Sequence, residues 1–292
     1  MHRSTTVTSQ DIPNRPSSAL RVAMARAVHQ LLDDPVVFDD PYALEVLPSP
    51  VQSMLQKDPF QFNEPVMRSL RAAVVARSRY SEDLLLNSRN MDLRQYVILG
   101  AGLDTYALRN EDESLVVFEV DLHTTQEQKR KAIGGLSSGA NSVRYVPCDL
   151  RKDALLPRLV ENGLEAQQPV FVAWLGVTPY LTREQIVETL KSLAHLPEGS
   201  QIVFDYRVSP ERLPPIERAI ESHAANLFAQ MGEPWLSSFD PEEMSALLSS
   251  IGFTLRENLD ASAINHRYFA RRKDGLQATG AGFRLLHAVR NC

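Results

Sequence analysis

The feature that most constrains the fold is an apolar run that ends in two closely spaced glycines. The segment from Tyr96 to Thr105 reads YVILGAGLDT. Its apolar residues are typical of a parallel strand that is covered on both faces. Gly100 and Gly102 have no Cβ atom, so the backbone can turn sharply there and approach a ligand closely. The segment therefore predicts a strand and a turn at the ligand-binding edge of an α/β sheet.

A second strand follows and ends in an acid. Residues 118–121 read FEVD, so Asp121 stands at the end of this strand. A carboxylate accepts hydrogen bonds and donates none, which suits the two hydroxyl groups of a ribose. The glycine turn and the acid together favour an adenine nucleoside at the carboxyl ends of the strands.

The residues after the glycines help to distinguish between nucleoside ligands. A dinucleotide fingerprint has a third glycine, which lets a pyrophosphate approach the helix N-terminus. Here Thr105 stands in its place and Asp104 precedes it. A carboxylate repels a pyrophosphate and attracts an ammonium group. The pattern therefore favours S-adenosylmethionine over NAD, although a turn without any ligand remains an alternative.

Composition excludes several other classes of protein. The chain has 292 residues, of which 43% are hydrophobic and 23% charged, and its net charge is −5. The negative charge argues against a nucleic-acid scaffold. The sequence contains no apolar run of the roughly 20 residues that span a bilayer, and its first residues lack the apolar core of a signal peptide. Its two cysteines have no metal-binding spacing. We expect a cytoplasmic protein without a metal, membrane or nucleic-acid partner.

Strand and helix patterns alternate from residue 95 onward, which predicts one domain with a mostly parallel sheet between helices. Residues 1–16 are expected to be a disordered lead, residues 17–94 a helical cap, and residues 95–292 the core. Within the cap, we expect a short helix that begins at Asp39 and ends at Pro48 and Pro50. The expected strands are 95–100, 115–120, 143–147, 169–175, 201–207, 253–259 and 283–289.

Residues 210–235 interrupt this alternation after the fifth strand. A helical run from Ile216 to Met231 is bordered by prolines on both sides. Its apolar residues have helical spacing, which predicts an amphipathic helix. We expect a lid over the ligand-binding cleft that buries its apolar face only when the cleft is closed, although a permanently docked helix remains an alternative.

Several of these motifs together resemble a known family. The segments 100–105 and 118–121, Asp149 with Leu150, Arg77 upstream and the run 174–181 (WLGVTPYL) are similar to the leucine carboxyl methyltransferase family. The similarity is greatest to its bacterial branch of S-adenosylmethionine-dependent methyltransferases. The resemblance implies a class I methyltransferase (Rossmann-like) fold of seven strands, with the last strand antiparallel and a helical N-terminal cap.

The resemblance also implies how the cofactor is held. Arg77 matches the arginine that pairs with the carboxylate of S-adenosylmethionine, a task for which a planar guanidinium is suited. Asp121 matches the ribose acid, and Asp149 with Leu150 matches the adenine contacts. The implied cofactor-binding residues are Arg77, Gly100, Ala101, Gly102, Asp104, Asp121, Leu122, Asp149, Leu150 and Leu175.

One position departs from the family pattern. Many members carry a glutamate at the end of the fourth strand, where this chain has Leu175. Together with Trp174 it makes this wall apolar, unless Trp174 belongs to the core. An apolar wall argues against a polar cofactor contact from this position and for a hydrophobic substrate side.

The catalytic residues are not identified by the sequence. Tyr180, Tyr206 and His223 are candidate catalytic residues, and His223 could be a general base. Arg207 or Arg68 could hold an acidic substrate. The predicted function is O-methylation of a carboxyl or hydroxyl group of a small molecule. A nicotinamide-dependent oxidoreductase and a non-catalytic S-adenosylmethionine-binding protein remain as alternatives, and the acceptor and the oligomeric state stay open.

Overall fold

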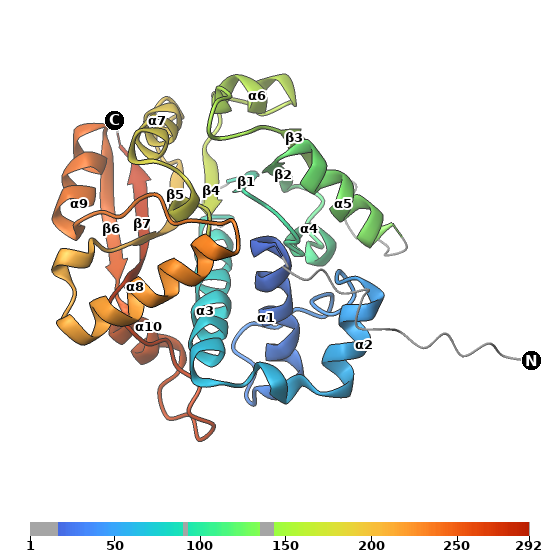
Figure 1. The fold of residues 1–292 in the computed structure, drawn as a ribbon. Coiled ribbons are helices and arrows are strands. Elements are labelled where there is room, and N and C mark those ends of the chain that lie inside the picture. Colours follow the sequence, from blue (N-terminus) through green and yellow to red (C-terminus); the bar gives the residue numbers. More distant parts are fainter. Residues whose placement is uncertain (1–16, 90–92, 135–142, 292) are drawn as a thin grey trace, which may run out of the picture.

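The computed structural model describes residues 17–89, 93–134 and 143–291 of the chain. The expected disordered lead, residues 1–16, lies outside the described residues. The described part forms two regions, a helical one that begins the chain and a sheet between helices (Figure 1).

The sheet has seven strands in the described part of the chain, in the order β3-β2-β1-β4-β5-β7-β6. β7 is antiparallel to both of its neighbours, and the other pairs are parallel. The expected mostly parallel sheet with an antiparallel last strand is therefore confirmed, and each strand begins and ends within one residue of its predicted bounds. The strands are β1 (Gln95–Leu99), β2 (Val116–Asp121), β3 (Val143–Pro147), β4 (Val170–Trp174), β5 (Gln201–Arg207), β6 (Phe253–Leu259) and β7 (Phe283–Arg290).

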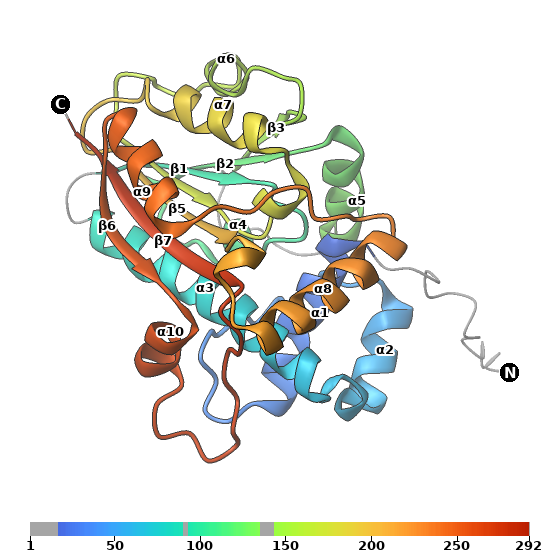
Figure 2. The same ribbon diagram turned by 60° about the vertical axis from the view of Figure 1, so that its left-hand side comes forward.

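Helices cover both faces of the sheet (Figures 1 and 2). One face packs against α6 (Leu155–Glu161), α7 (Arg183–Leu193) and α9 (Pro241–Ser250). The other face packs against α3 (Pro65–Arg89), α4 (Tyr106–Arg109) and α10 (Ala261–Tyr268). The remaining long helices are α1 (Ser18–Leu32), α2 (Ser49–Lys57), α5 (His123–Ile133) and α8 (Pro215–Gln230).

A buried polar cluster fixes the helical cap. Arg71 of α3 donates two hydrogen bonds to the Asp33 carboxylate, at 2.7 and 3.0 Å, and His29 Nδ1 lies 2.7 Å from the same carboxylate. His29 Nε2 accepts a hydrogen bond of 2.9 Å from the Val37 N–H. Burial alone would raise the pKa of Asp33, but the hydrogen bonds from His29 and Arg71 outweigh it and lower the pKa. The cluster joins α1 to α3.

One predicted helix of the cap is wrong. The residues after Asp39 form turns, and α2 begins at Ser49, with Pro50 in its first turn. The prolines therefore begin a helix and do not end one. Proline suits the first turn of a helix, because the N–H that it lacks would have no partner there and because its fixed φ is close to the helical value.

Candidate functional site

The carboxyl ends of five parallel strands meet at one edge of the sheet. Gly100 follows β1, Asp121 ends β2, Asp149 follows β3, Leu175 follows β4 and Arg207 ends β5. Figure 2 shows α8 and α1 crossing at this edge. The structure thus gathers most of the predicted site residues, although they lie far apart in the sequence.

The glycine turn is closely packed. Gly100 has φ +67° and Gly102 has φ +50°, a region that favours glycine. The N–H groups of Gly100 and Ala101 donate to the Val120 carbonyl, at 2.8 and 3.1 Å. A Cβ atom on Gly100 would overlap the Val177 side chain, and one on Gly102 would lie 3.1 Å from the Ala19 Cβ. Both glycines are therefore needed by the packing as well as by the turn.

Asp121 is positioned by the backbone around it. Its two carboxylate oxygens accept hydrogen bonds of 2.7 Å from the N–H groups of Gly102 and Leu122. Burial raises the pKa of Asp121 in spite of these bonds. The Thr125 side chain also bonds to this carboxylate, which keeps acceptor capacity because a carboxylate has about four lone-pair sites. The neighbouring Leu122 is 38% exposed. An acid with acceptor capacity beside an exposed apolar side chain fits a ribose and an adenine ring.

Asp149 already has a charged partner. Arg151 donates two hydrogen bonds to its carboxylate, at 2.8 and 2.7 Å, and these bonds lower the pKa of Asp149. Leu150 is half-buried and packs against the core. The Arg151 side chain is 56% exposed, so it is free to move away from the carboxylate.

Arg77 is held at the site by Asp205. Its Nη1 lies 2.9 Å from Asp205 Oδ2, and Oδ1 of the same carboxylate accepts a hydrogen bond from the Gly176 N–H at 2.5 Å. A Cβ atom on Gly176 would overlap the Arg77 guanidinium. Asp205 thus fixes the Arg77 guanidinium and also the turn after β4, against which this guanidinium packs.

Asp104 has partners within the protein. Its carboxylate accepts a hydrogen bond of 2.7 Å from the Tyr106 N–H and lies 3.3 Å from Nη1 of the buried Arg26. Burial opposes ionisation, but the charges of Arg26, Lys129 and Arg109 outweigh it and lower the pKa of Asp104. The carboxylate therefore joins the turn before α4 to α1.

Thr105 takes the place of the third glycine of a dinucleotide fingerprint. It is fully buried, and its hydroxyl donates a hydrogen bond of 2.7 Å to Asp40 of the cap. The side chain thus fills the space in which a pyrophosphate would approach the backbone. This geometry agrees with the preference for S-adenosylmethionine over NAD.

The candidate catalytic residues separate in space. Tyr180 is half-buried beside the site, and burial raises its pKa, with Glu233, Arg21 and Arg77 close enough to affect it. Tyr206 packs in the core on the opposite face of β5 from Asp205 and hydrogen-bonds to Asn258. His223 is exposed on α8, and Arg68 donates to the Asp274 carbonyl. Of the three candidate catalytic residues, the structure brings only Tyr180 to the site, and of the two candidate arginines only Arg207.

The apolar wall after β4 is smaller than expected. Trp174 is fully buried and packs against Phe204, with ring centroids 6.0 Å apart. Its side chain belongs to the core on one face of the sheet, whereas the half-buried Leu175 belongs to the other. Trp174 is thus a core residue, and Leu175 alone remains as an apolar residue at the site.

The helix α8 faces the protein with its polar side. Glu217 accepts a hydrogen bond of 2.6 Å from the Ala281 N–H, and Glu221 pairs with Arg207. By contrast, Ile216 is 77% exposed and Ile220 is 59% exposed. In this structure the helix therefore presents carboxylates, and not its apolar face, to the cleft. The reason is that a buried guanidinium and a backbone N–H at this edge require acceptors.

The segment after α8 joins the helical cap. The Glu233 carboxylate accepts a hydrogen bond of 2.7 Å from the Ser18 N–H and pairs with Arg21. Phe228 and Trp235 pack together with ring centroids 4.9 Å apart. Sequence reasoning assigned no role to Glu221, Glu233 or Trp235, because a contact between distant segments leaves no local pattern.

A cavity of about 460 Å³ lies beneath α8. The Arg207 guanidinium lies 3.6 Å from the centre of the Trp235 ring and is 17% exposed. Burial lowers the pKa of Arg207 to about 10, so it stays charged at neutral pH. The lining residues are Arg183, Arg207, Val208, Ser209, Pro210, Glu211, Leu213, Glu221, Ser222, Ala225, Trp235, Leu236, Ser237 and Ser238.

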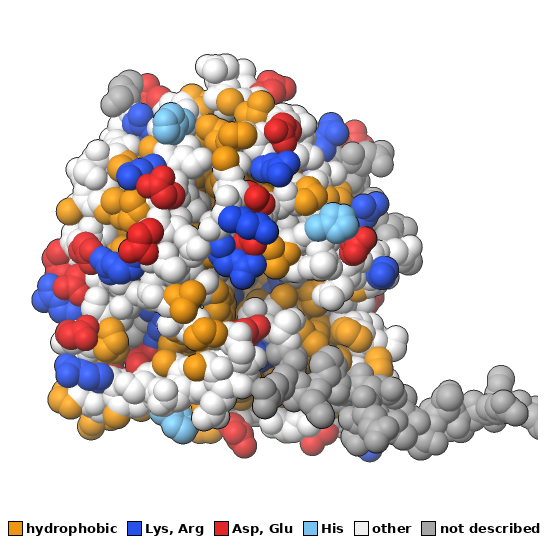
Figure 3. Space-filling model, turned by 45° about the horizontal axis from the view of Figure 1, so that its top comes forward, with side chains coloured by type: hydrophobic (Ala, Val, Ile, Leu, Met, Phe, Trp, Pro, Cys, Tyr) orange, Lys and Arg blue, Asp and Glu red, His pale blue; other side chains and the backbone are white. Residues whose placement is uncertain are grey.

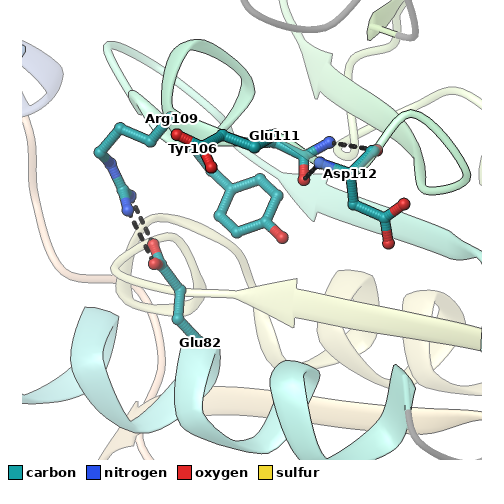
Figure 4. A pocket seen from close by; sticks show the side chains of 6 residues that line it. Glu82, Tyr106, Arg109, Glu111 and Asp112 are labelled. Atoms are coloured by element: carbon teal, nitrogen blue, oxygen red, sulfur yellow. Dashed lines mark hydrogen bonds and ion pairs between the residues drawn. The ribbon is translucent and has the colours of Figure 1, made fainter.

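A second cavity, of about 510 Å³, lies next to α4 (Figure 4). Arg109 reaches across it and donates two hydrogen bonds to Glu82, at 2.8 and 2.5 Å. None of its lining residues is among the predicted site residues. The ion pair joins α4 to α3, so the groups at this cavity have a structural role.

The described residues contain no group of metal-ligating side chains and no helix long and apolar enough to cross a membrane. On the face drawn in Figure 3, basic and acidic side chains are interspersed. The edge of the sheet beneath α8 is therefore the candidate functional site.

Comparison with known proteins identifies the family. The model of the leucine carboxyl methyltransferase family matches residues 19–194. A protein of Bacillus subtilis (strain 168), named "Putative S-adenosyl-L-methionine-dependent methyltransferase YktD", is 33% identical over 299 residues, which cover 94% of this chain and 97% of that protein.

Solved structures show the same fold. A DUF574 family protein from Streptomyces avermitilis MA-4680 superposes with a TM-score of 0.61 at 16% identity, covering 94% of this chain and 98% of its own. Magnesium protoporphyrin IX methyltransferase from Synechocystis PCC 6803, crystallised with bound S-adenosylhomocysteine, has a TM-score of 0.50 at 14% identity and covers 78% of this chain and 88% of its own. The predicted class I fold is thus confirmed, and the family model favours a methyltransferase over a nicotinamide-dependent enzyme. The chain therefore belongs to the leucine carboxyl methyltransferase family, a family of S-adenosylmethionine-dependent methyltransferases.

Proposed function

We propose that the chain is an O-methyltransferase that acts on a carboxyl or hydroxyl group of a small molecule. The observation that carries this proposal is the cavity of about 460 Å³ beneath α8, next to the end of β5. Its volume lies within the range of pockets that enclose small ligands, roughly 300–1,000 Å³. The family model is named for a carboxyl acceptor, which supports oxygen as the methylated atom.

The residues at the strand ends fit S-adenosylmethionine. Arg77 and the glycine turn would hold its amino-acid part, Asp121 its ribose, and Asp149 with Leu150 its adenine. The bound cofactor supplies an electrophilic methyl group. The protein contributes position and orientation, which account for about 7–11 kcal/mol of many barriers. A carboxylate acceptor needs no base. A hydroxyl acceptor would have to lose its proton to another group, because burial raises the pKa of Tyr180 and keeps it protonated at neutral pH.

Replacement of Asp121 tests the cofactor site directly. Asp121→Ala should lower the affinity for S-adenosylhomocysteine at least about tenfold, because a hydrogen bond to a charged group contributes roughly 1.5–3 kcal/mol. Isothermal titration of the purified protein measures this change. Glu113→Ala, which removes an exposed carboxylate, is the matched control and should bind as the wild type does. NAD should show no binding in the same titration.

Two results would contradict this proposal. If Asp121→Ala binds S-adenosylhomocysteine as tightly as the wild type, Asp121 does not contact the ribose. If the wild type binds NAD more tightly than S-adenosylhomocysteine, the proposed cofactor is wrong.

We further propose that residues 210–235 are a lid over this site. No residue of α8 is fully buried, and carboxylate contacts from Glu217, Glu221 and Glu233 hold the segment. Such contacts weaken in salt, because the Debye length falls to about 3 Å at 1 M. The lid should therefore open more readily than helices that bury apolar side chains.

Hydrogen exchange should show this difference. The amides of α8 should exchange at least about tenfold faster than those of α7, and 1 M salt should accelerate α8 alone. The helix α7 is the internal control, because it buries Ile186, Leu190 and Leu193. Saturation with S-adenosylhomocysteine should slow α8. Equal protection of α8 and α7 under all conditions would mean that α8 is a fixed part of the core.

A further inference from the structure

The cavity beneath α8 contains two guanidinium groups that lie on aromatic rings. Arg207 lies 3.6 Å from the centre of the Trp235 ring, and Arg183 lies 4.2 Å from the centre of the Phe239 ring. Both arginines line the cavity. A guanidinium stacked on a ring keeps its N–H groups in the plane parallel to the ring, where they are oriented for a planar carboxylate.

Arg207 lies next to the place where the methyl donor is expected. It follows Asp205 by two positions on β5, so both side chains project from the same face of the sheet. Asp205 in turn holds Arg77 at 2.9 Å. Tyr180 is close enough to Arg207 to affect the pKa of Arg207, and Arg77 is close enough to Tyr180 to affect the pKa of Tyr180. A group bound to Arg207 would therefore lie beside the amino-acid end of the cofactor.

A carboxylate of the protein itself occupies Arg207. Glu221 pairs with the guanidinium from α8, and its carboxyl group lies so close to Gly282 that a Cβ atom there would overlap it. The pair is only partly exposed, at 17% for Arg207 and 21% for Glu221. Because no residue of α8 is fully buried, a small shift of the helix can withdraw Glu221 from the guanidinium.

We propose that this cavity selects an acceptor that carries a carboxylate group, and that this group replaces Glu221 on Arg207. The proposal rests on the proposed function, because it names the substrate class of the same site. Glu221 keeps the buried guanidinium paired while no acceptor is present, since an unpaired buried charge is costly. Ala225 and Leu236 line the same cavity and offer apolar surface to the body of the acid. The acceptor class is thus a small organic acid with a flat apolar body.

Benzoate and benzamide form a pair of probes that share a shape and differ in charge. With the protein saturated with S-adenosylhomocysteine, benzoate should bind at least about tenfold more tightly than benzamide, as expected for a hydrogen-bonded charge pair. Glu221→Gln should strengthen benzoate binding, because the competing carboxylate is gone. Arg207→Gln should abolish the preference for benzoate. Arg212→Gln, which removes an exposed arginine outside the cavity, should leave the preference unchanged.

Each outcome either supports or overturns the proposed acceptor class. Equal binding of the two probes to the wild type, or no binding of either, overturns the proposal. So does a preference for benzoate that persists in Arg207→Gln. Melting temperatures check that the variants are folded, and Glu221→Gln keeps the test valid if Arg207→Gln does not fold. Titration with S-adenosylhomocysteine alone separates the two proposals. If that titration fails, the proposed function is wrong, and if it succeeds without a preference for benzoate, only the acceptor class is wrong.

Discussion

Replacing Lys129 with Met is expected to lower the free energy of unfolding by about 3–5 kcal/mol, because it leaves a buried carboxylate without its partner. Lys129 of α5 is 2% exposed and lies 2.5 Å from the Glu119 carboxylate of β2, which is 1% exposed. Lys129 bonds to Glu119 Oε2, and Glu119 Oε1 has no hydrogen-bond partner in the described structure. Chemical denaturation at neutral pH measures the loss.

The effect should extend to the cofactor site. Glu119 and Asp121 are two positions apart on β2. The charge of Lys129 opposes the effect of burial at Glu119, Asp121 and Asp104, because it acts to lower the pKa of each of these acids. Removal of this charge leaves three carboxylates close together, so the affinity for S-adenosylhomocysteine should fall too. The ammonium group of Lys129 therefore stabilises the acidic region beneath the glycine turn.

The stability lost in Lys129→Met should also depend on pH. Burial raises the pKa of Glu119 above its ordinary value of 4.5, and the loss of Lys129 should raise it further. An acid with a raised pKa in the folded state favours folding when it is protonated, so its contribution is lost as the pH rises through the folded pKa. The deficit of Lys129→Met relative to the wild type should therefore shrink as the pH falls toward 4.5.

Two variants serve as controls for this prediction. Lys131→Met removes an exposed lysine from the same helix and should change the stability by no more than about 0.5 kcal/mol. The double variant Lys129→Met with Glu119→Met should recover most of the loss, because no charge is left without a partner. A Lys129→Met variant as stable as Lys131→Met would show that the ion pair does not stabilise the fold.

Much of the sheet could be predicted because its signals are local. Apolar runs, glycine turns and acids at strand ends follow directly from the requirements of a buried parallel strand. The family resemblance then placed Arg77 and Asp149 at the site before any contact was known. Asp149 lies at the edge where the parallel strands end because it follows β3, whereas Arg77 reaches this edge from α3 and pairs there with Asp205.

The error in the cap arose at its prolines. Pro48 and Pro50 were interpreted as the end of a helix, although proline suits the first turn of α2. Contacts between distant segments left no local pattern at all. Glu221 of α8 pairs with Arg207, and Glu217 accepts a hydrogen bond from the Ala281 N–H. Asp104 pairs with Arg26 from α1.

Replacing Gly100 with Ala is expected to lower the free energy of unfolding by about 2–5 kcal/mol. A left-handed conformation costs a residue with a Cβ atom about 1–2 kcal/mol, and overpacking adds about 1–3 kcal/mol. Both costs apply, because Gly100 has φ +67° and its Cβ atom would overlap Val177. The affinity for S-adenosylhomocysteine should fall at least about tenfold, since relief of the overlap moves the turn that holds Asp121 through Gly102.

Gly163→Ala separates the two costs. Gly163 also has a positive φ, at +94°, but within the described structure nothing lies within 4 Å of a Cβ atom built there. This variant should lose only the conformational part, about 1–2 kcal/mol, and bind S-adenosylhomocysteine normally. The double variant Gly100→Ala with Val177→Ala should recover the overpacking part, because the methyl groups that overlap are gone. If Gly100→Ala is no less stable than Gly163→Ala and binds equally well, Val177 yields without cost. In that case only the positive φ would favour glycine at position 100, and the packing against Val177 would not constrain the cofactor site.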